Sequence, residues 1–108
     1  MDLDALRALV TVVELGSFVA ASRRLGIARP TLRRRLDALE QEVGVPLLVR
    51  TKSGSQPTGA GALLAERGRE LLRDGNALLS AVRELGDEPR GELRLVVPVG
   101  IAPPIVAM

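Results

Sequence analysis

Apolar residues in the first part of the chain recur every three or four positions, which is the spacing of one helix face. This pattern predicts a first helix that ends before Gly16, with acidic residues in its first turn. A short second helix follows, with Ser17 as its N-cap and Gly26 as its terminator. A third helix starts near Arg29 and stops at Gly44. The apolar stripe of the third helix consists of Leu32, Leu36, Leu39 and Val43.

The pattern changes after the third helix from helical spacing to β-favouring segments. "VPLLVR" and "SQPT" flank "TKSG", so we expect a small β-hairpin whose turn-like part is Lys52–Ser55. Pro57 restricts this hairpin to an edge, because proline lacks the N–H that a central strand needs. Three helices with a glycine-containing turn before the third, followed by a hairpin, predict a mainly α fold of the winged helix-turn-helix class.

A long helix is predicted from about Gly59 to Leu85, with Thr58 as its N-cap. Such a helix of about 27 residues is about 40 Å long, which is longer than needed to pack on a domain formed by residues 1–58. Two series of residues repeat every seven positions: Leu64, Leu71, Leu78 and Leu85, and Gly61, Gly68 and Gly75 with Val82 continuing. The two series lie on adjacent positions of one face, a pattern typical of helix-to-helix packing. Each interior glycine costs about 1 kcal/mol of helix propensity, so its repetition favours a close backbone approach. We favour dimerisation over packing on the chain's own domain. The residues assigned to the dimer contact are Leu64, Gly68, Leu71, Gly75, Leu78, Val82 and Leu85.

The chain therefore divides into three predicted parts. Residues 1–58 form the winged helix-turn-helix, 59–86 the linker and dimerisation helix, and 87–108 a hinge and the first strand of a truncated second domain. No apolar run approaches the roughly 20 residues needed to span a bilayer. The acidic start "MDLDALRAL" is unlike a signal peptide, so we expect a cytoplasmic, nucleoid-associated protein.

The composition argues against an enzyme. The chain has 108 residues, 46% of them hydrophobic, and its one aromatic residue is Phe18, which we assign to the core. It contains no Cys and no His, which removes disulfides, thiolate chemistry, nearly all zinc sites and the commonest general base. There is also no glycine-rich phosphate loop, and no clustered carboxylates are expected to be buried. We expect no cofactor and no catalytic residue.

The distribution of charge points to a polyanion as the partner. The net charge is only +2, but residues 1–58 hold nine basic and six acidic residues, whereas 59–86 hold four of each. Six arginines and no acid lie between Arg23 and Arg35. A local basic patch of this kind is typical of a nucleic-acid binder. A solvated helix face is the alternative, and the surrounding helix-turn-helix pattern favours DNA contact.

The arginines of the third helix point in different directions. At about 100° per residue, Arg34 points almost directly away from the apolar stripe, with Arg33 about 90° to one side of the stripe and Arg35 about 70° to the other. Arg34 is therefore the best candidate for the major groove. Arg35 lies nearest the core edge and is expected to reach toward Glu42 or a phosphate. The residues expected to contact DNA are Arg29, Pro30, Thr31, Arg33, Arg34, Arg50 and Lys52.

The order and spacing of these elements resemble the LysR-type bacterial transcriptional regulators over essentially the whole chain. The resemblance runs from "LRALVTVVELGSFVAASRRLGIARPTLRRRLDALEQEVGVPLLVRT" through "TGAG" and the long helix to "GELRLVVP". It implies a winged helix-turn-helix, a linker-helix dimer and usually a tetramer of the full-length protein. It also implies binding to an interrupted inverted repeat near promoters, with a small-molecule inducer bound by an effector domain that this chain lacks.

Several positions depart from the family's usual residues. Ala28-Arg29-Pro30 stands where the family usually has Ser-Gln-Pro, and Arg33-Arg34-Arg35 stands for Ser-Arg-Gln. Leu48 replaces the usual Phe of the first wing strand, and Pro57-Thr58-Gly59-Ala60-Gly61 replaces Leu-Thr-Glu-Ala-Gly. We expect the fold to be retained, and the preferred DNA sequence is the property that these changes leave open.

The leading hypothesis is a sequence-specific, double-stranded-DNA-binding transcriptional regulator of LysR type. Its recognition helix, about Arg29–Glu42, would lie in the major groove, and a dimer would bind an interrupted inverted repeat. A second hypothesis is a non-specific architectural DNA binder, because the additional arginines strengthen phosphate contact. A third is a protein-interaction module whose long helix pairs with a partner.

Overall fold

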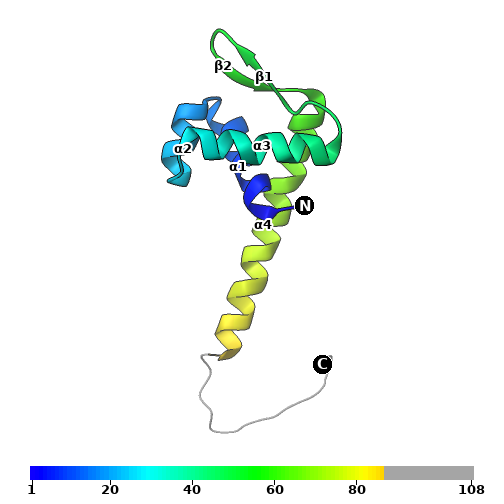
Figure 1. Ribbon diagram of the computed structural model, residues 1–108. Coiled ribbons are helices and arrows are strands. Elements are labelled where there is room, and N and C mark those ends of the chain that lie inside the picture. The colour runs from blue at the N-terminus through cyan, green and yellow to red at the C-terminus, as the bar shows by residue number, and fades with distance from the viewer. Residues whose placement is uncertain (87–108) are drawn as a thin grey trace, which may run out of the picture. The chain divides into compact units, whose positions relative to one another are not determined.

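The computed structural model describes residues 1–86, which form four helices and a two-stranded antiparallel sheet (Figure 1). The strand expected after residue 90 lies outside the described residues. This mainly helical architecture confirms the predicted winged helix-turn-helix class. Among residues 1–86, no helix is long and apolar enough to cross a membrane. The elements are α1 (Leu3–Leu15), α2 (Phe18–Leu25), α3 (Arg29–Val43), β1 (Leu48–Thr51), β2 (Gly54–Pro57) and α4 (Gly59–Gly86).

The ends of α1 and α2 follow from local side-chain and backbone chemistry, as predicted. Gly16 and Gly26 end the two helices in the left-handed conformation, with φ of 67° and 69°. The Ser17 hydroxyl accepts a hydrogen bond from the Ala20 N–H at 3.1 Å and so caps α2. Ala28 precedes α3 and makes no side-chain capping bond, and Gly44 ends that helix. Arg29 and Pro30 are the first two residues of α3, and Pro30 has no backbone N–H group that would need a capping partner.

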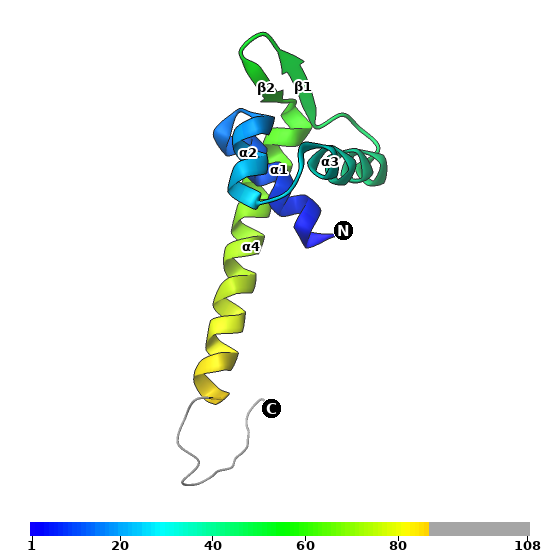
Figure 2. The same cartoon turned by 60° about the vertical axis from the view of Figure 1, so that its left-hand side comes forward.

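The core of residues 1–76, which form one compact unit, is built around α1. Both views place α1 among α2, α3 and the first part of α4 (Figures 1 and 2). Leu, Val and Ala fill this core, since Phe18 packs against it but remains partly exposed. The main buried side chains are Leu6, Leu9, Val12, Ala21, Leu32, Leu36, Leu39, Leu47 and Ala65.

The assignment of Val43 to the apolar core stripe of α3 is wrong. Val43 is 43% exposed, whereas Leu32, Leu36 and Leu39 of the same stripe are buried. Val43 is the last residue of α3, and Gly44 turns the chain away immediately after it, so the final position of the stripe has no core to cover it.

The hairpin forms the predicted wing, with a shorter turn than expected. The register pairs Leu48 with Pro57 and Thr51 with Gly54, which leaves only Lys52 and Ser53 in the turn. The expectation that the turn extends to Ser55 is therefore wrong. Gly54 adopts a φ of 131°, which side-chain-bearing residues rarely adopt, and this lets the chain reverse within two residues.

Thr58 connects the start of α4 to the segment before β1. Its hydroxyl accepts a hydrogen bond from the Gly61 N–H at 3.0 Å, which confirms the predicted N-cap. The same hydroxyl donates to the Pro46 carbonyl at 2.7 Å, and the Thr58 N–H donates to the Leu47 carbonyl at 3.0 Å. The wing is thereby closed at its base, so that its two ends are held together where α4 begins.

Candidate nucleic-acid interface

The first two turns of α3 present an arginine-rich surface. Arg29, Arg33 and Arg34 are exposed, while Arg35 is partly buried. These exposures follow the directions derived from the helical period, with Arg34 outward and Arg35 at the core edge. The Arg34 guanidinium donates to the Thr31 hydroxyl at 3.4 Å, a long bond between two neighbouring positions of the same face. This surface can donate many hydrogen bonds to phosphates or to the edges of bases.

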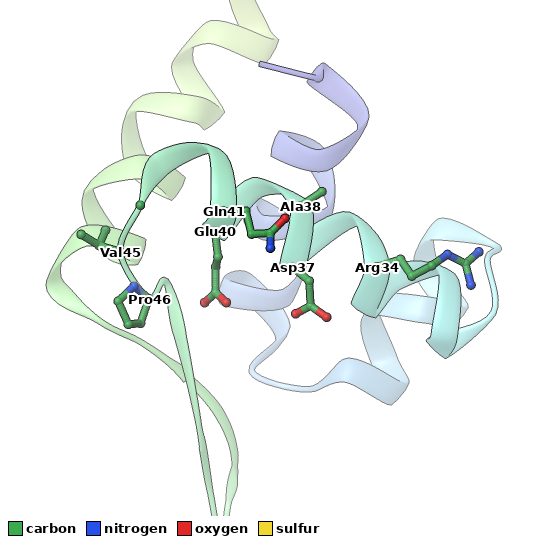
Figure 3. A pocket seen from close by; sticks show the side chains of 8 residues that line it. Arg34, Asp37, Ala38, Glu40, Gln41, Val45 and Pro46 are labelled. Atoms are coloured by element: carbon green, nitrogen blue, oxygen red, sulfur yellow. The ribbon is translucent and has the colours of Figure 1, made fainter.

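The charge along α3 changes sign from one end to the other. Arg29 to Arg35 carry no acid, whereas Asp37, Glu40 and Glu42 lie in the second half. Because the N-terminus of a helix also carries partial positive charge, the N-terminal half of α3 is the half whose charge would attract a polyanion. A surface hollow along the acidic half is lined by Asp37, Glu40 and Gln41, and Figure 3 shows Arg34 directed away from its two carboxylates.

Glu42 has a different ionic partner from the one expected. Its carboxylate lies 3.1 Å from the ammonium group of Met1, and Arg35 forms no ion pair within residues 1–86. Of the two expected partners of Arg35, Glu42 therefore forms no ion pair with it among residues 1–86, and contact with a phosphate stays a prediction. Glu42 pairs with Met1 because α1 brings the N-terminus close to the end of α3, a juxtaposition that helical spacing within α3 does not reveal.

Arg33 stacks on the ring of Phe18. The guanidinium carbon of Arg33 lies 4.8 Å from the ring centroid, within the range of a cation–π interaction. Phe18 begins α2 and Arg33 lies in the second turn of α3, so the contact spans the turn of the helix-turn-helix. The sequence analysis placed Phe18 only in the core and missed this contact. The sequence did offer one signal, because Phe18 is the one aromatic residue of the chain and so the one ring on which an arginine could stack.

Glu40 fixes the segment that leads into the wing. Its carboxylate accepts hydrogen bonds from the Leu47 N–H at 2.7 Å and the Leu48 N–H at 3.2 Å. Figure 3 shows Glu40 on the recognition helix beside the segment that carries Pro46. Two backbone donors just before and at the start of β1 are satisfied by one side chain from α3, which sequence analysis did not identify. The wing and α3 are thus positioned relative to one another.

The wing also contacts the turn between α1 and α2. The Ser55 N–H donates to the Gly16 carbonyl at 3.2 Å, and a side chain at Gly54 would collide with that carbonyl. Arg50 and Lys52 are exposed on the hairpin, with Arg50 paired to Ser55 and Lys52 in the turn. Within residues 1–86 Arg50 forms no ion pair with an acid. Both cations are available to a ligand that lies along the wing.

Comparisons with known proteins identify the family. The family model described as "Bacterial regulatory helix-turn-helix protein, lysR family" matches residues 3–62. This chain belongs to the LysR family. The small neutral protease regulatory protein of Streptomyces coelicolor is 41% identical over 83 residues, which are 77% of this chain and 25% of that protein. The nitrogen assimilation regulatory protein nac of Klebsiella aerogenes is 38% identical over 103 residues, 95% of this chain and 32% of that protein.

Solved LysR structures share the fold. The DNA-binding domain of BenM, in complex with catB site 1 DNA, matches with a TM-score of 0.79 and 32% identity over 83% of this chain and 100% of that chain. The DNA-binding domain of CbnR in complex with DNA matches with a TM-score of 0.74 and 31% identity, over 80% of this chain and 99% of that one.

The LysR assignment agrees with the prediction of a regulator and not an enzyme, since these relatives are regulatory proteins. The chain spans about a quarter to a third of the length of these two curated relatives. It therefore corresponds to the part of a LysR regulator that contains the winged helix-turn-helix.

The glycines of α4 make close contacts within this LysR domain. Gly68 is buried, and a Cβ at this position would lie 3.0 Å or less from side-chain atoms of Leu6. Gly61 is buried against the backbone of Leu47, whereas a Cβ at Gly75 would meet nothing within 4 Å. Gly61 and Gly68 thus make their close approaches within the single chain, where the sequence analysis had assigned Gly68 to the contact between two chains. Leu64 is likewise partly buried against the core.

The remaining members of the predicted dimer series are exposed. Leu71, Leu78, Val82 and Leu85 are 48% to 69% exposed in the single chain, and Gly75 is also exposed. Exposed large apolar side chains at seven-residue spacing are available for packing against another helix.

Proposed function

We propose that this chain is the double-stranded-DNA-binding part of a bacterial LysR-type transcriptional regulator. The observation that carries the proposal is the exposed, acid-free arginine surface on the N-terminal half of α3, on a fold that BenM and CbnR use in complexes with DNA. We place the first two turns of α3 in the major groove. Arg29, Arg33 and Arg34 supply its charge, and the acidic second half faces away from phosphate.

The wing supplies a second, sequence-independent contact. Arg50 and Lys52 are exposed on a hairpin that Glu40, Thr58 and the Gly16 carbonyl hold in place. A cation on a fixed hairpin beside the recognition helix suits a phosphate or the minor groove next to the site that α3 reads.

The active form that we propose is a dimer through α4, bound to an interrupted inverted repeat. The exposed apolar series of α4 supports this arrangement, since a two-fold dimer presents two recognition helices to two half-sites. A full-length protein would contain an effector domain that binds a small-molecule inducer and would assemble further into a tetramer in the cytoplasm. The chain itself needs no cofactor for DNA binding.

Selection of duplexes from a random library by the purified chain tests the proposal. We expect one enriched motif with two related half-sites, and an affinity for that motif that falls steeply as salt concentration rises. Footprinting on the promoter region of its own gene should show protection at a matching site. Protection no stronger than on random DNA would leave only a non-specific, architectural binder.

The architectural alternative rests on a specific observation. The clustered exposed arginines strengthen the phosphate contribution, which is independent of sequence. Affinities for the selected motif and for a scrambled duplex of equal length, measured at one salt concentration, separate the two functions. A ratio of about 1000 or more is typical of a specific regulator, and a ratio near 1 indicates an architectural protein.

A further inference from the structure

We propose that Phe18 is a positioning residue for DNA reading, which holds the Arg33 guanidinium so that Arg33 selects a guanine. This inference rests on the proposed function, because it assumes that α3 enters the major groove. It adds a specific role for a residue that does not itself lie on the recognition helix. The relationship that carries it is the stack of Arg33 on the Phe18 ring, 4.8 Å from guanidinium carbon to ring centroid.

The ring is itself held in place. Phe18 is the first residue of α2, directly after the Ser17 cap, whose hydroxyl accepts the Ala20 N–H. The ring packs against the apolar core and is partly buried, so one part touches the core while the rest supports the guanidinium. A stack on a fixed aromatic restricts an arginine far more than contact with another flexible side chain does.

Stacking leaves the hydrogen-bond donors of Arg33 free. A guanidinium carries five N–H donors, and its attraction to an aromatic ring forms no conventional hydrogen bond with them. Asp37, one turn further along α3, forms no ion pair with Arg33 within residues 1–86. The ring therefore orients the group without occupying the edge that would bind a base.

The orientation matters because guanine and phosphate make different demands on arginine. Guanine presents O6 and N7 side by side, and arginine grips both with two parallel N–H groups only when its plane is aligned with the base. A phosphate is bound from many directions and does not require that alignment. An arginine whose guanidinium is held against one ring is consequently better suited to guanine than to phosphate. The Arg34 guanidinium donates to Thr31 and has no such aromatic support among residues 1–86.

A comparison of five proteins tests the proposal: the unchanged chain, Phe18→Leu, Phe18→Tyr, Arg33→Ser and the double variant that combines Phe18→Leu with Arg33→Ser. Leucine retains an apolar side chain against the core but removes the ring, whereas tyrosine retains the ring. Each protein selects duplexes from a random library, and base preference is scored at every position. Urea unfolding and affinity for a random duplex verify that each variant is folded and still binds DNA.

We expect the unchanged chain to select guanine at one position of each half-site, and Arg33→Ser to lose that preference. Phe18→Leu should reduce the preference for guanine at this position by about twofold to fivefold, the value of an exposed cation–π contact. Preferences at other positions, and affinity for random DNA, should stay the same. Phe18→Tyr should behave as the unchanged chain, and Phe18→Leu combined with Arg33→Ser should equal Arg33→Ser alone.

Three results would overturn the inference in distinguishable ways. A full guanine preference in Phe18→Leu, lost only in Arg33→Ser, would show that Arg33 reads the base without the ring. Equal weakening at all positions, or for random DNA, would make Phe18 a purely structural residue. A selection by the unchanged chain that enriches no motif would instead defeat the proposed sequence-specific function, and this inference with it.

Discussion

The Glu40 carboxylate accepts a hydrogen bond from the backbone N–H of Leu47 at 2.7 Å, and this bond joins α3 to the segment that enters the wing. Leu47 is also among the most buried side chains of the molecule. Its N–H lies where the chain has left α3 and has not yet entered β1, so regular secondary structure offers it no partner. Glu40 supplies that partner from the helix and also binds the next N–H, of Leu48, at 3.2 Å.

Glu40→Ala is expected to lower the free energy of unfolding by about 1–3 kcal/mol, because it leaves part-buried N–H groups without an acceptor. Glu40→Gln retains an acceptor oxygen and should lose less. Urea unfolding of the three proteins measures the difference. Glu42→Ala is the matched control. Within residues 1–86 the Glu42 carboxylate forms one ion pair, with the N-terminal ammonium group at an exposed site, and its loss should cost less than about 1 kcal/mol. Equal stability of the Glu40 and Glu42 alanine variants would show that the hydrogen bonds from the Leu47 and Leu48 N–H groups to Glu40 contribute nothing to the free energy of unfolding.

Gly61 and Gly75 belong to one seven-residue series but should respond oppositely to alanine. A Cβ at Gly61 would collide with the Leu47 carbonyl and lie 2.9 Å from its carbon, and this neighbour is backbone that yields little. Gly61→Ala is therefore expected to destabilise the domain by more than 1 kcal/mol. At Gly75 nothing lies within 4 Å, so Gly75→Ala should stabilise the isolated helix by up to about 1 kcal/mol. Thermal unfolding of dilute, monomeric protein provides the comparison, and a loss of stability in Gly75→Ala would contradict it.

The helix ends and the fold class could be predicted from the sequence because they depend on neighbours in the chain. Ser17, Thr58 and the glycines that end α1, α2 and α3 act on backbone groups within a few residues, and each was found where it was predicted. The directions of the α3 arginines also followed from the helical period alone.

The contacts that shape the DNA-reading surface could not be predicted in the same way. Phe18 lies 15 residues before Arg33 on a different helix, so the helical period that places the side chains of α3 does not relate the two residues. Glu40 reaches Leu47 across an irregular segment, for which no period applies. The burial of Gly68 against Leu6 likewise depends on how α1 and α4 pack. The exposure of Val43 has the same kind of cause, because the apolar stripe of α3 continues to Val43 but the core does not extend that far. Local spacing predicts which face a residue takes, whereas tertiary packing decides what lies opposite.

Arg34→Ala is expected to weaken binding to the selected duplex by about 1–3 kcal/mol, which is roughly 5-fold to 150-fold. Arg34 is exposed on the outward side of α3, and only the Thr31 hydroxyl competes for its guanidinium among the described residues. Fluorescence anisotropy at a fixed salt concentration measures the affinity. The matched control is Arg73→Ala on α4, which removes the same charge from an exposed site away from α3. Equal losses in the two variants would mean that net charge alone, and not a position on the recognition helix, determines binding.

The exposed apolar series of α4 predicts a dimer, and a single charged residue placed in that series should dissociate it. Leu78 is 64% exposed in the single chain, and Leu71 and Leu85 lie seven residues to either side of it. Leu78→Asp places a carboxylate in this series and should shift the chain from dimer to monomer in sedimentation equilibrium, because an unpaired charge is costly to bury. Ser80→Asp adds the same charge about 200° around the helix and should leave the dimer intact. Both variants retain α3, so affinity for a single half-site should be unchanged, while Leu78→Asp loses tight binding to the paired half-sites. An unchanged mass for Leu78→Asp would contradict dimerisation through this face of α4.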